Sequence, residues 1–234
     1  MAQAAAPTIL PRARRAAVLC ALLAASAQAQ ATGGHFAVTD ALLLDPGACK
    51  LDGWSSRSPG RVRLLHAGGA CRVGPIEIGA VGDYEREDAN GSTTEWGLGI
   101  TWAADLGERL AIGASLAPTW QAGARPRLQG TTAAALLSWT VDERLSLHAN
   151  IGRDLVHRGP DQLRAGVAGA WKLRRHWTAL LERYRAEDSH FVRGGVRWEP
   201  APGWTVDLSR AHRIAGPGSA SWTLGLTREF DRGR

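Results

Sequence analysis

The stretch Trp96-Gly97-Leu98-Gly99-Ile100-Thr101-Trp102 alternates large apolar residues with glycine and threonine. A period of two places successive side chains on opposite faces of a β-strand, so one face is apolar and the other is small or polar. The same alternation recurs at residues 110–116, 145–151 and 222–227. No stretch has a helical period of comparable strength, and the sequence therefore predicts an all-β fold.

The breaks between these strands alternate along the chain between long and short. Long polar breaks lie at residues 87–93, 122–130, 155–162, 185–189 and 212–218, and short breaks at residues 105–108, 142–144, 174–176 and 199–203. Tight periplasmic turns and longer outer loops are typical of outer-membrane barrels. We therefore predict an up-and-down antiparallel transmembrane β-barrel over residues 47–234.

Twelve strands fit between the breaks, an even number as in bacterial single-chain barrels. They are expected at residues 47–57, 61–71, 75–86, 94–104, 109–121, 131–141, 145–154, 163–173, 177–184, 190–198, 204–211 and 220–230. Charged residues interrupt the alternation of the first two strands. Without residues 47–71 the count is ten, which is also even.

The positions of the tryptophans favour a membrane barrel over a soluble β-sandwich of the same period. The chain has 10 Trp but only 2 Tyr and 3 Phe. Indole rings gather where the apolar belt of a barrel meets water. Six lie on the apolar face beside short turns and predict an aromatic girdle: Trp102, Trp139, Trp171, Trp177, Trp198 and Trp204. Trp54, Trp96, Trp120 and Trp222 could form the opposite girdle; in a soluble sandwich all of these rings would cap the core.

The last strand ends at Phe230, which resembles the signal that the barrel-assembly machinery recognises in outer-membrane proteins. A four-residue tail and the charged Arg228 on the apolar face depart from that pattern. The assembly machinery and outer-membrane lipid are therefore expected partners.

The N-terminus predicts export from the cytoplasm. Three arginines within residues 12–15 precede an apolar stretch at residues 16–25, and Ala27-Gln28-Ala29 fits the small-x-small cleavage rule. We predict a signal peptide over residues 1–29; a buried N-terminal helix is the alternative. Residues 30–46 are expected in the periplasm or as a plug in the lumen.

The overall charge gives no reason to expect a nucleic-acid partner. Loss of three arginines with the signal peptide would leave 25 basic and 22 acidic residues, against a formal net charge of +6 for the whole chain. No apolar run approaches the length of about 18–20 residues that a membrane-spanning helix requires.

Cys49 and Cys71 face each other if residues 47–57 and 61–71 form a hairpin that turns at residues 58–60. Two cysteines in an exported chain favour a disulfide. A reactive thiol or a metal pair is the alternative, but no further Cys or His lies at zinc-ligand spacing. We expect no metal and no cofactor.

Charged side chains on the other face would line the lumen of a barrel. The expected hairpins place Glu182 opposite Arg193, and Asp207 opposite Gly195. The predicted charged network consists of Glu182, Arg193, Asp207 and Arg197. Such a network forms either a selective constriction or a salt-bridged filling. The lumen or constriction residues predicted on this basis are Glu182, Arg193, Arg197, Asp207, Arg164, Lys172 and His148. Arg164, Lys172, Arg193 and Arg197 would favour anions if the lumen is open.

His148 also raises the hypothesis of a lipid hydrolase. Outer-membrane phospholipases are twelve-stranded and place a His and a Ser two residues apart, but position 150 is Asn in this chain. Ser146 lies on the lumen face beside His148, on the wrong side for that arrangement. No catalytic residue is therefore predicted, and the chain is not expected to be an enzyme.

Residues 36–54, FAVTDALLLDPGACKLDGW, resemble the start of the outer-membrane proteins of the "MetA-pathway of phenol degradation" type. The shared features are a Thr-Asp-Ala stretch, a Pro-Gly turn, and an acidic residue close to an aromatic one. In this chain the second Asp of the stretch is missing, and Asp52 stands where Glu is usual. The resemblance implies an outer-membrane channel-like protein that handles small or aromatic compounds.

The sequence as a whole predicts a monomeric barrel in the outer membrane of a Gram-negative cell. Its expected function is passive transport of small solutes, either aromatic or anionic. The alternatives are an outer-membrane lipid hydrolase and a closed structural barrel.

Overall fold

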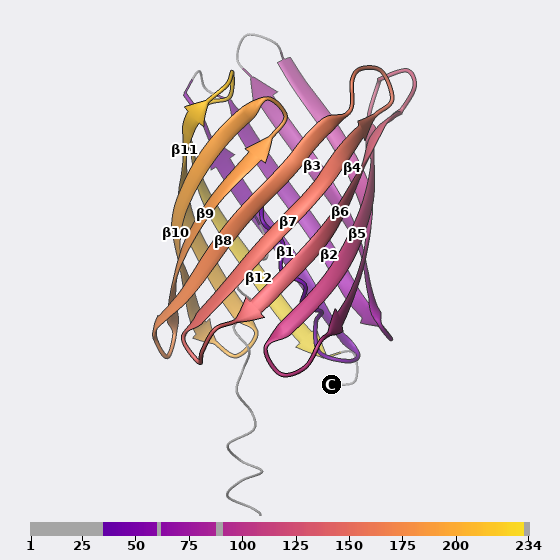
Figure 1. Cartoon of the computed structure of the whole chain (residues 1–234). Helices are drawn as coiled ribbons and strands as arrows, with labels where there is room; N and C mark the ends of the chain where they lie inside the picture. The colour runs from indigo at the N-terminus through magenta and orange to yellow at the C-terminus, as the bar shows by residue number, and fades with distance from the viewer. Residues whose placement is uncertain (1–34, 60–61, 88–90, 232–234) are drawn as a thin grey trace, which may run out of the picture. The chain divides into compact units, whose positions relative to one another are not determined.

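The computed structural model describes residues 35–59, 62–87 and 91–231, and these form a closed antiparallel barrel (Figure 1). The strands are β1 (Ala48–Arg57), β2 (Arg63–Val73), β3 (Ile76–Glu87), β4 (Gly91–Asp105), β5 (Leu110–Gln121), β6 (Leu128–Thr140), β7 (Leu145–Val156), β8 (Gln162–Arg174), β9 (Trp177–Ala186), β10 (Ser189–Ala201), β11 (Trp204–Ala215) and β12 (Ser221–Asp231). Each strand pairs with its neighbours in sequence, and β1 closes the barrel against β12. The predicted signal peptide lies outside the described residues.

The predicted up-and-down barrel is confirmed, and so is the count of 12 strands. The ten-strand alternative is wrong because the residues with mixed alternation form β1 and β2, both fully paired in the barrel wall. Turns of two to four residues join the strands at one end, and most connections at the other end are longer (Figure 1). These two ends are called here the short-turn end and the long-loop end.

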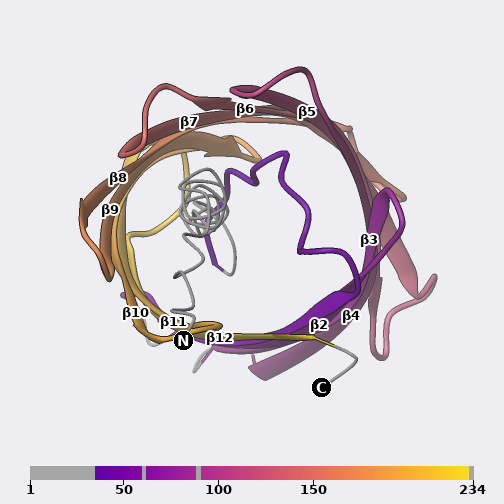
Figure 2. The same cartoon turned by 90° about the horizontal axis from the view of Figure 1, so that it is seen from below.

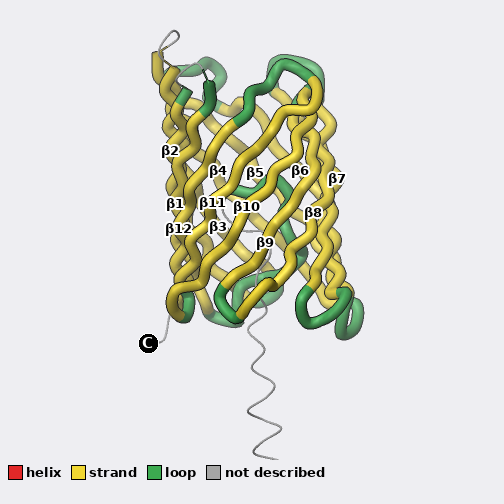
Figure 3. Tube along the Cα trace, turned by 90° about the vertical axis from the view of Figure 1, so that its left-hand side faces the viewer, coloured by secondary structure: helices red, strands yellow, loops and turns green. Residues whose placement is uncertain are grey.

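The strands extend further into the predicted long breaks than the sequence pattern suggested. β9 continues to Ala186 and β10 begins at Ser189, so the expected break at residues 185–189 is only a two-residue turn. Glu187 adopts a φ of 55° there, the left-handed conformation that a tight hairpin turn requires. Figure 3 shows the strands in yellow, inclined across the barrel wall, with green connections at both ends.

The two faces of the wall differ in the way that the alternation predicted. In β9, Thr178, Leu180 and Glu182 are buried in the barrel, whereas Trp177 and Leu181 are exposed on its outside. The same division runs around the barrel and leaves an exterior rich in exposed Leu, Ile, Val and Trp. Closure pairs every edge strand, as a spanning sheet requires in lipid. No helix in the described part of the chain is long and apolar enough to cross a membrane.

The predicted disulfide is present between Cys49 of β1 and Cys71 of β2. The two residues are direct cross-strand partners, as the hairpin register predicted, with Cα atoms 4.0 Å apart. The bond links the strand that closes the barrel to its neighbour at the short-turn end.

The tryptophans predicted for the girdle are all exposed on the outer face near the short turns: Trp102, Trp139, Trp171, Trp177, Trp198 and Trp204. Trp96 and Trp222 are exposed toward the long-loop end, and Trp120 stacks on Trp96. Trp54 is different, because it lies on the lumen face of β1 and stacks on His66 at 4.8 Å between ring centroids. Its assignment to the second girdle was therefore wrong.

Arg228 lies on the outer face at the short-turn end, and a lipid-facing charge costs far less there than at the middle of the membrane. Its guanidinium lies 5.1 Å from the centre of the Trp204 ring, and its Nη1 donates a hydrogen bond to the carbonyl of Pro202 at 2.7 Å. These contacts explain how the last strand accommodates the charge.

Candidate functional site

Residues 35–46, just before β1, run inside the barrel, across the ring of strands in Figure 2. We call residues 35–46 the lumen segment. Its side chains Val38, Ala41 and Leu44 are almost fully buried, although the segment forms no strand or helix. Because the segment adds no strand to the wall, its backbone polar groups need partners from lumen-facing side chains.

Glu182 of β9 holds the first part of the lumen segment. Its carboxylate accepts hydrogen bonds from the backbone N–H of Ala37, at 3.1 and 3.2 Å, and of Val38, at 3.0 Å. Glu182 is also paired with Arg193 of β10 at 3.1 Å. Arg193 in turn donates to the carbonyl oxygen of His35 and to the Tyr184 hydroxyl. The predicted ion pair thus binds both N–H and carbonyl groups of the segment's backbone.

Two further anchors hold the middle and the end of the segment. The backbone N–H of Ala41 donates to Ser138 Oγ at 2.7 Å, and Ser138 Oγ lies 2.8 Å from His148 Nδ1. Arg72 Nη1 donates to the Leu44 carbonyl at 2.7 Å. The backbone N–H of Leu44 donates to Glu77 Oε2 at 3.4 Å. Glu77 also forms an ion pair with Lys50 of β1 at 2.7 Å.

Apolar contacts fill the space between these polar anchors. Phe36 packs with Ala170 and Leu180, and Val38 packs with Ala168 and Tyr184. Ala41 packs with Ala111 and Leu136 nearer the short-turn end. Each of these three side chains of the segment thus contacts one alanine and one larger residue of the wall.

Glycines of the wall bring the segment closer still. A Cβ atom on Gly166 would lie 2.6 Å from Val38 Cγ2, and one on Gly195 would lie 3.3 Å from Phe36 Cζ. Both positions lie on the lumen face, where alanine would intrude on the segment. The alternation of glycine with large apolar residues thus leaves room inside the barrel as well as marking the strands.

His35, at the start of the described segment, lies beside two arginines. Its Nε2 is 2.6 Å from Ser209 Oγ, and its ring stacks on Phe36. Burial, reinforced by the positive charges of Arg193 and Arg197, lowers the pKa of His35 to about 3. His35 is therefore neutral at pH 7 when the segment is docked.

Most of the predicted lumen charges are paired. Glu182 faces Arg193, as predicted. Asp207 faces Arg197, with which it pairs at 2.8 Å, and not Gly195 as predicted. The turn after β10 lies at Pro202 and Gly203, and the register shifts between Trp198 and Ala201, so the pairing moves by two residues.

The remaining predicted residues have separate environments. Arg164 forms a bidentate pair with Asp154 of β7, with nitrogen–oxygen distances of 3.0 and 3.1 Å. Lys172 lies on the lumen face opposite Thr178 and has no ion-pair partner among the described residues. His148 is buried between Ser138 and Ser146.

The Ser138–His148 pair has the separation of a nucleophile and a base, but its surroundings favour a structural role. Both side chains are buried, and Ser138 Oγ already accepts the Ala41 amide. A nucleophile has to reach a substrate carbonyl. With the segment docked, Ser138 is only 4% exposed, and its hydroxyl is held by Ala41 and His148.

Several side chains that hold the segment were missed by the sequence analysis, notably Ser138, Tyr184, Arg72 and Glu77. Ser138, Arg72 and Glu77 lie on polar positions of the alternation, so the sequence predicts that they face the lumen. Their hydrogen-bond partners could not be predicted, because the sequence does not show where an irregular segment runs. No group of His, Cys, Asp and Glu suited to a metal ion occurs in the ranges that the structure describes.

Comparison with known proteins places the chain in a family. Residues 19–230 match the family described as "Uncharacterised conserved protein UCP029691". The chain belongs to this family. No curated protein matches it.

Solved structures share the barrel at very low sequence identity. The KdgM porin has a TM-score of 0.62 and 8% identity, covering 77% of this chain and 99% of its own. The NanC porin has a TM-score of 0.61 and 8% identity, covering 76% and 98%. The Pseudomonas putida toluene transporter TodX has a TM-score of 0.50 and 11% identity, covering 86% and 96%. At these identities the likeness shows the fold.

Together with the apolar exterior, this fold makes the chain an outer-membrane β-barrel. The predicted fold class and location are therefore confirmed. None of these findings concerns the MetA-pathway group in particular. The neighbours are porins and transporters, and the site described above is a polar lumen with a docked segment.

Proposed function

We propose that this protein is an outer-membrane channel for small solutes, and that the lumen segment sets how much of the channel is open. The observation that carries the proposal is the chemistry of the lumen wall. Its inward side chains include Arg164 and Asp154, which keep 36% and 16% of their side-chain surface exposed beside their ion pair, and Lys172, which has no ion-pair partner among the described residues, whereas a barrel filled for stability alone needs only packed side chains. The lumen segment occupies part of this polar interior.

The geometry supports only a weak preference for charge. Arg164, Arg193 and Arg197 each face a carboxylate at ion-pair distance, which offsets their attraction for an anion. Glu95, the cross-strand partner of Asp83 nearer the long-loop end, adds negative charge there, whereas Asp83 lies 2.7 Å from His66 Nδ1. Of the four cations predicted to favour anions, only Lys172 has no carboxylate partner among the described residues.

The narrower version of the proposal is that the solute is aromatic or anionic. Aromatic solutes follow from the resemblance of residues 36–54, and the lumen offers stacked rings at Tyr184 and Phe191, with centroids 5.1 Å apart. The neighbours differ in what their descriptions name: one KdgM structure is a complex with disordered oligogalacturonate, and TodX is a toluene transporter. The rate at which proteoliposomes swell in benzoate, acetate and glucose separates these classes. Fast swelling in benzoate alone indicates an aromatic solute, and fast swelling in both benzoate and acetate indicates an anionic one.

A closed structural barrel is the second candidate, and the hydrogen bonds that fix the lumen segment favour it. The deciding experiment is the conductance of the exported, refolded chain in a planar bilayer under a KCl gradient. Discrete steps in the wild-type protein, or larger steps in a Glu182→Gln variant, support the channel. Silence of both proteins, with heat-modifiable migration to show that each is folded, would leave the structural barrel.

A further inference from the structure

A row of arginines crosses the outer surface of the barrel at its long-loop end. Arg86 of β3 pairs directly with Arg63 of β2, which pairs directly with Arg57 of β1. Trp222 of β12 continues the row beside Arg57, and Arg210 of β11 follows beside Trp222. All five side chains are exposed. We call these five residues the arginine row.

The next row toward the middle of the barrel is apolar. It contains Leu65, Tyr84, Leu224 and Leu208, all exposed, with Ser55 between them on β1. These side chains lie on the lipid-facing side of the wall. The arginine row therefore borders the apolar belt where hydrocarbon gives way to lipid headgroups.

The spacing of the arginines leaves their charges uncompensated. Strands lie about 4.8 Å apart, and like charges directly opposite each other in a sheet are destabilising. Among the described residues, no Asp or Glu forms an ion pair with Arg57, Arg63 or Arg86. An anion from outside the chain would relieve this repulsion.

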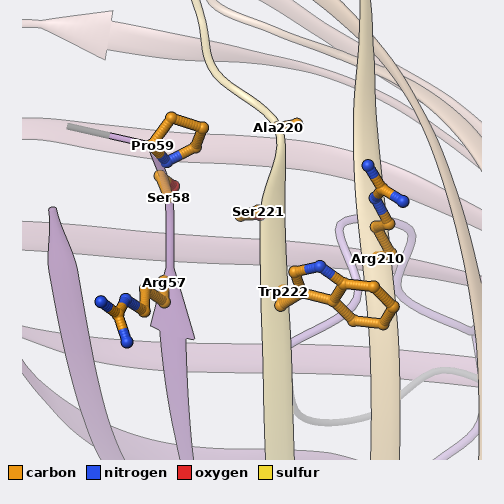
Figure 4. A pocket seen from close by; sticks show the side chains of 7 residues that line it. All are labelled: Arg57, Ser58, Pro59, Arg210, Ala220, Ser221 and Trp222. Carbon is orange, nitrogen blue, oxygen red and sulfur yellow. The ribbon is translucent and has the colours of Figure 1, made fainter. Parts of the chain in front are cut away.

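A groove between two of the row's arginines has room for such an anion (Figure 4). Its volume is about 370 Å³, and Arg57, Ser58, Pro59, Arg210, Ser221 and Trp222 line it. The Arg210 guanidinium lies 5.3 Å from the centre of the Trp222 ring. Guanidinium and hydroxyl groups are donors that suit phosphate oxygens, and arginine can bind phosphate with two parallel hydrogen bonds.

We propose that the arginine row and this groove bind the phosphate-bearing headgroup of a lipid in the leaflet around the long-loop end. The acyl chains of that lipid lie along Leu65, Tyr84, Leu224 and Leu208. The charged row and the apolar row together fit an amphipathic ligand, whereas a free phosphate would use only the first. The site is on the outside of the wall and does not depend on whether the lumen conducts.

The test measures binding of diphosphorylated lipid A to the full exported chain in a non-ionic detergent by native mass spectrometry. In an Arg57→Gln/Arg210→Gln variant we expect affinity to fall on the order of tenfold to thirtyfold, because the groove loses both guanidinium groups that would hold the phosphate. The matched control is Arg153→Gln/Arg183→Gln, which removes two exposed arginines from β7 and β9, away from the row. The control should bind as the wild type does.

Three results would overturn the proposal. Equal losses in the row variant and the control would mean that only overall charge matters. Equal binding of lipid A without its phosphates would remove the phosphate as the ligand. Binding of inorganic phosphate as tightly as lipid A would assign the groove to a free anion. If the first variant does not show heat-modifiable migration, Arg63→Gln/Arg86→Gln tests the same row with the same expected loss.

Discussion

Glu182 Oε2 lies 3.0 Å from the backbone nitrogen of Val38, across 144 positions of sequence. A wall carboxylate thus satisfies the backbone of a segment that precedes the whole barrel. The same carboxylate also faces Arg193 at 3.1 Å and is only 2% exposed. One buried carboxylate of the wall therefore holds both the lumen segment and the Arg193 guanidinium.

Glu182→Gln should release the lumen segment and leave the barrel closed. The substitution leaves Arg193 buried without its counter-charge, which costs about 3 kcal/mol. The ladders of all 12 strands do not depend on this pair. We expect faster amide hydrogen exchange at residues 35–44, measured by mass spectrometry, and unchanged heat-modifiable migration.

The control for this prediction is Asp154→Asn, which breaks the Arg164–Asp154 pair elsewhere in the lumen. That pair makes no hydrogen bond to the segment among the described residues. Unchanged exchange in Glu182→Gln, or equal changes in both variants, would show that Glu182 does not hold the segment.

Acid should weaken docking of the segment through His35. Its pKa is about 3 when docked and about 6.5 when the segment is free, so the free state binds more protons between these values. Docking therefore weakens as the pH falls below 6.5, by about 1.4 kcal/mol per pH unit, or about 2 kcal/mol at pH 5. Its stabilising contribution is fully present above pH 6.5.

The measurement compares exchange protection factors of residues 35–44 at pH 7 and pH 5, which corrects for the intrinsic exchange rate. A His35→Gln variant keeps a polar side chain that does not titrate, and it should lose this part of the pH dependence. The charged groups around the site, Glu182, Arg193, Arg197 and Asp207, are common to both proteins. The same pH dependence in the variant would assign it to those groups.

The sequence predicted the wall well and the interior poorly, for a physical reason. Alternation is a local property, so residues 96–102 predicted the faces of β4, and the expected hairpin turn at residues 58–60 predicted the register of β1 and β2 in which the two cysteines face each other. Register depends on where the turn lies and on any bulge beside it, and here the turn lies at Pro202 and Gly203 and not around residue 201, so Asp207 faces Arg197 and not Gly195. The path of the lumen segment depends on contacts with six or more strands, and no periodicity encodes those.

Removal of the disulfide should lower the stability of the barrel. The Cys49–Cys71 bond joins residues that are 22 positions apart in the sequence. Removing such a bond typically lowers the free energy of unfolding by about 2–4 kcal/mol. A Cys49→Ser/Cys71→Ser variant should unfold at a lower urea concentration, and loss of the heat-modifiable band on a gel measures this unfolding. Adding a reductant should lower the midpoint of the wild type and leave the variant unchanged. Equal midpoints for both proteins would contradict the prediction.

Gly166→Ala tests the docked position of the segment without changing any charge. The new Cβ would lie 2.6 Å from Val38 Cγ2 and 3.0 Å from Tyr184 Cβ, so the segment or the strand has to move. Overpacking of this kind costs about 1–3 kcal/mol. We expect faster exchange around Val38 with the barrel still closed.

The control is Gly99→Ala, because a Cβ at this lumen-facing position of β4 meets no atom within 4 Å. Adding Val38→Ala to Gly166→Ala should restore protection, since the smaller side chain makes room for the new methyl group. Such a restoration is a coupling between two contacting residues that independent sites would not show. If the double variant is as deprotected as the sum of the single variants, Val38 does not lie against Gly166.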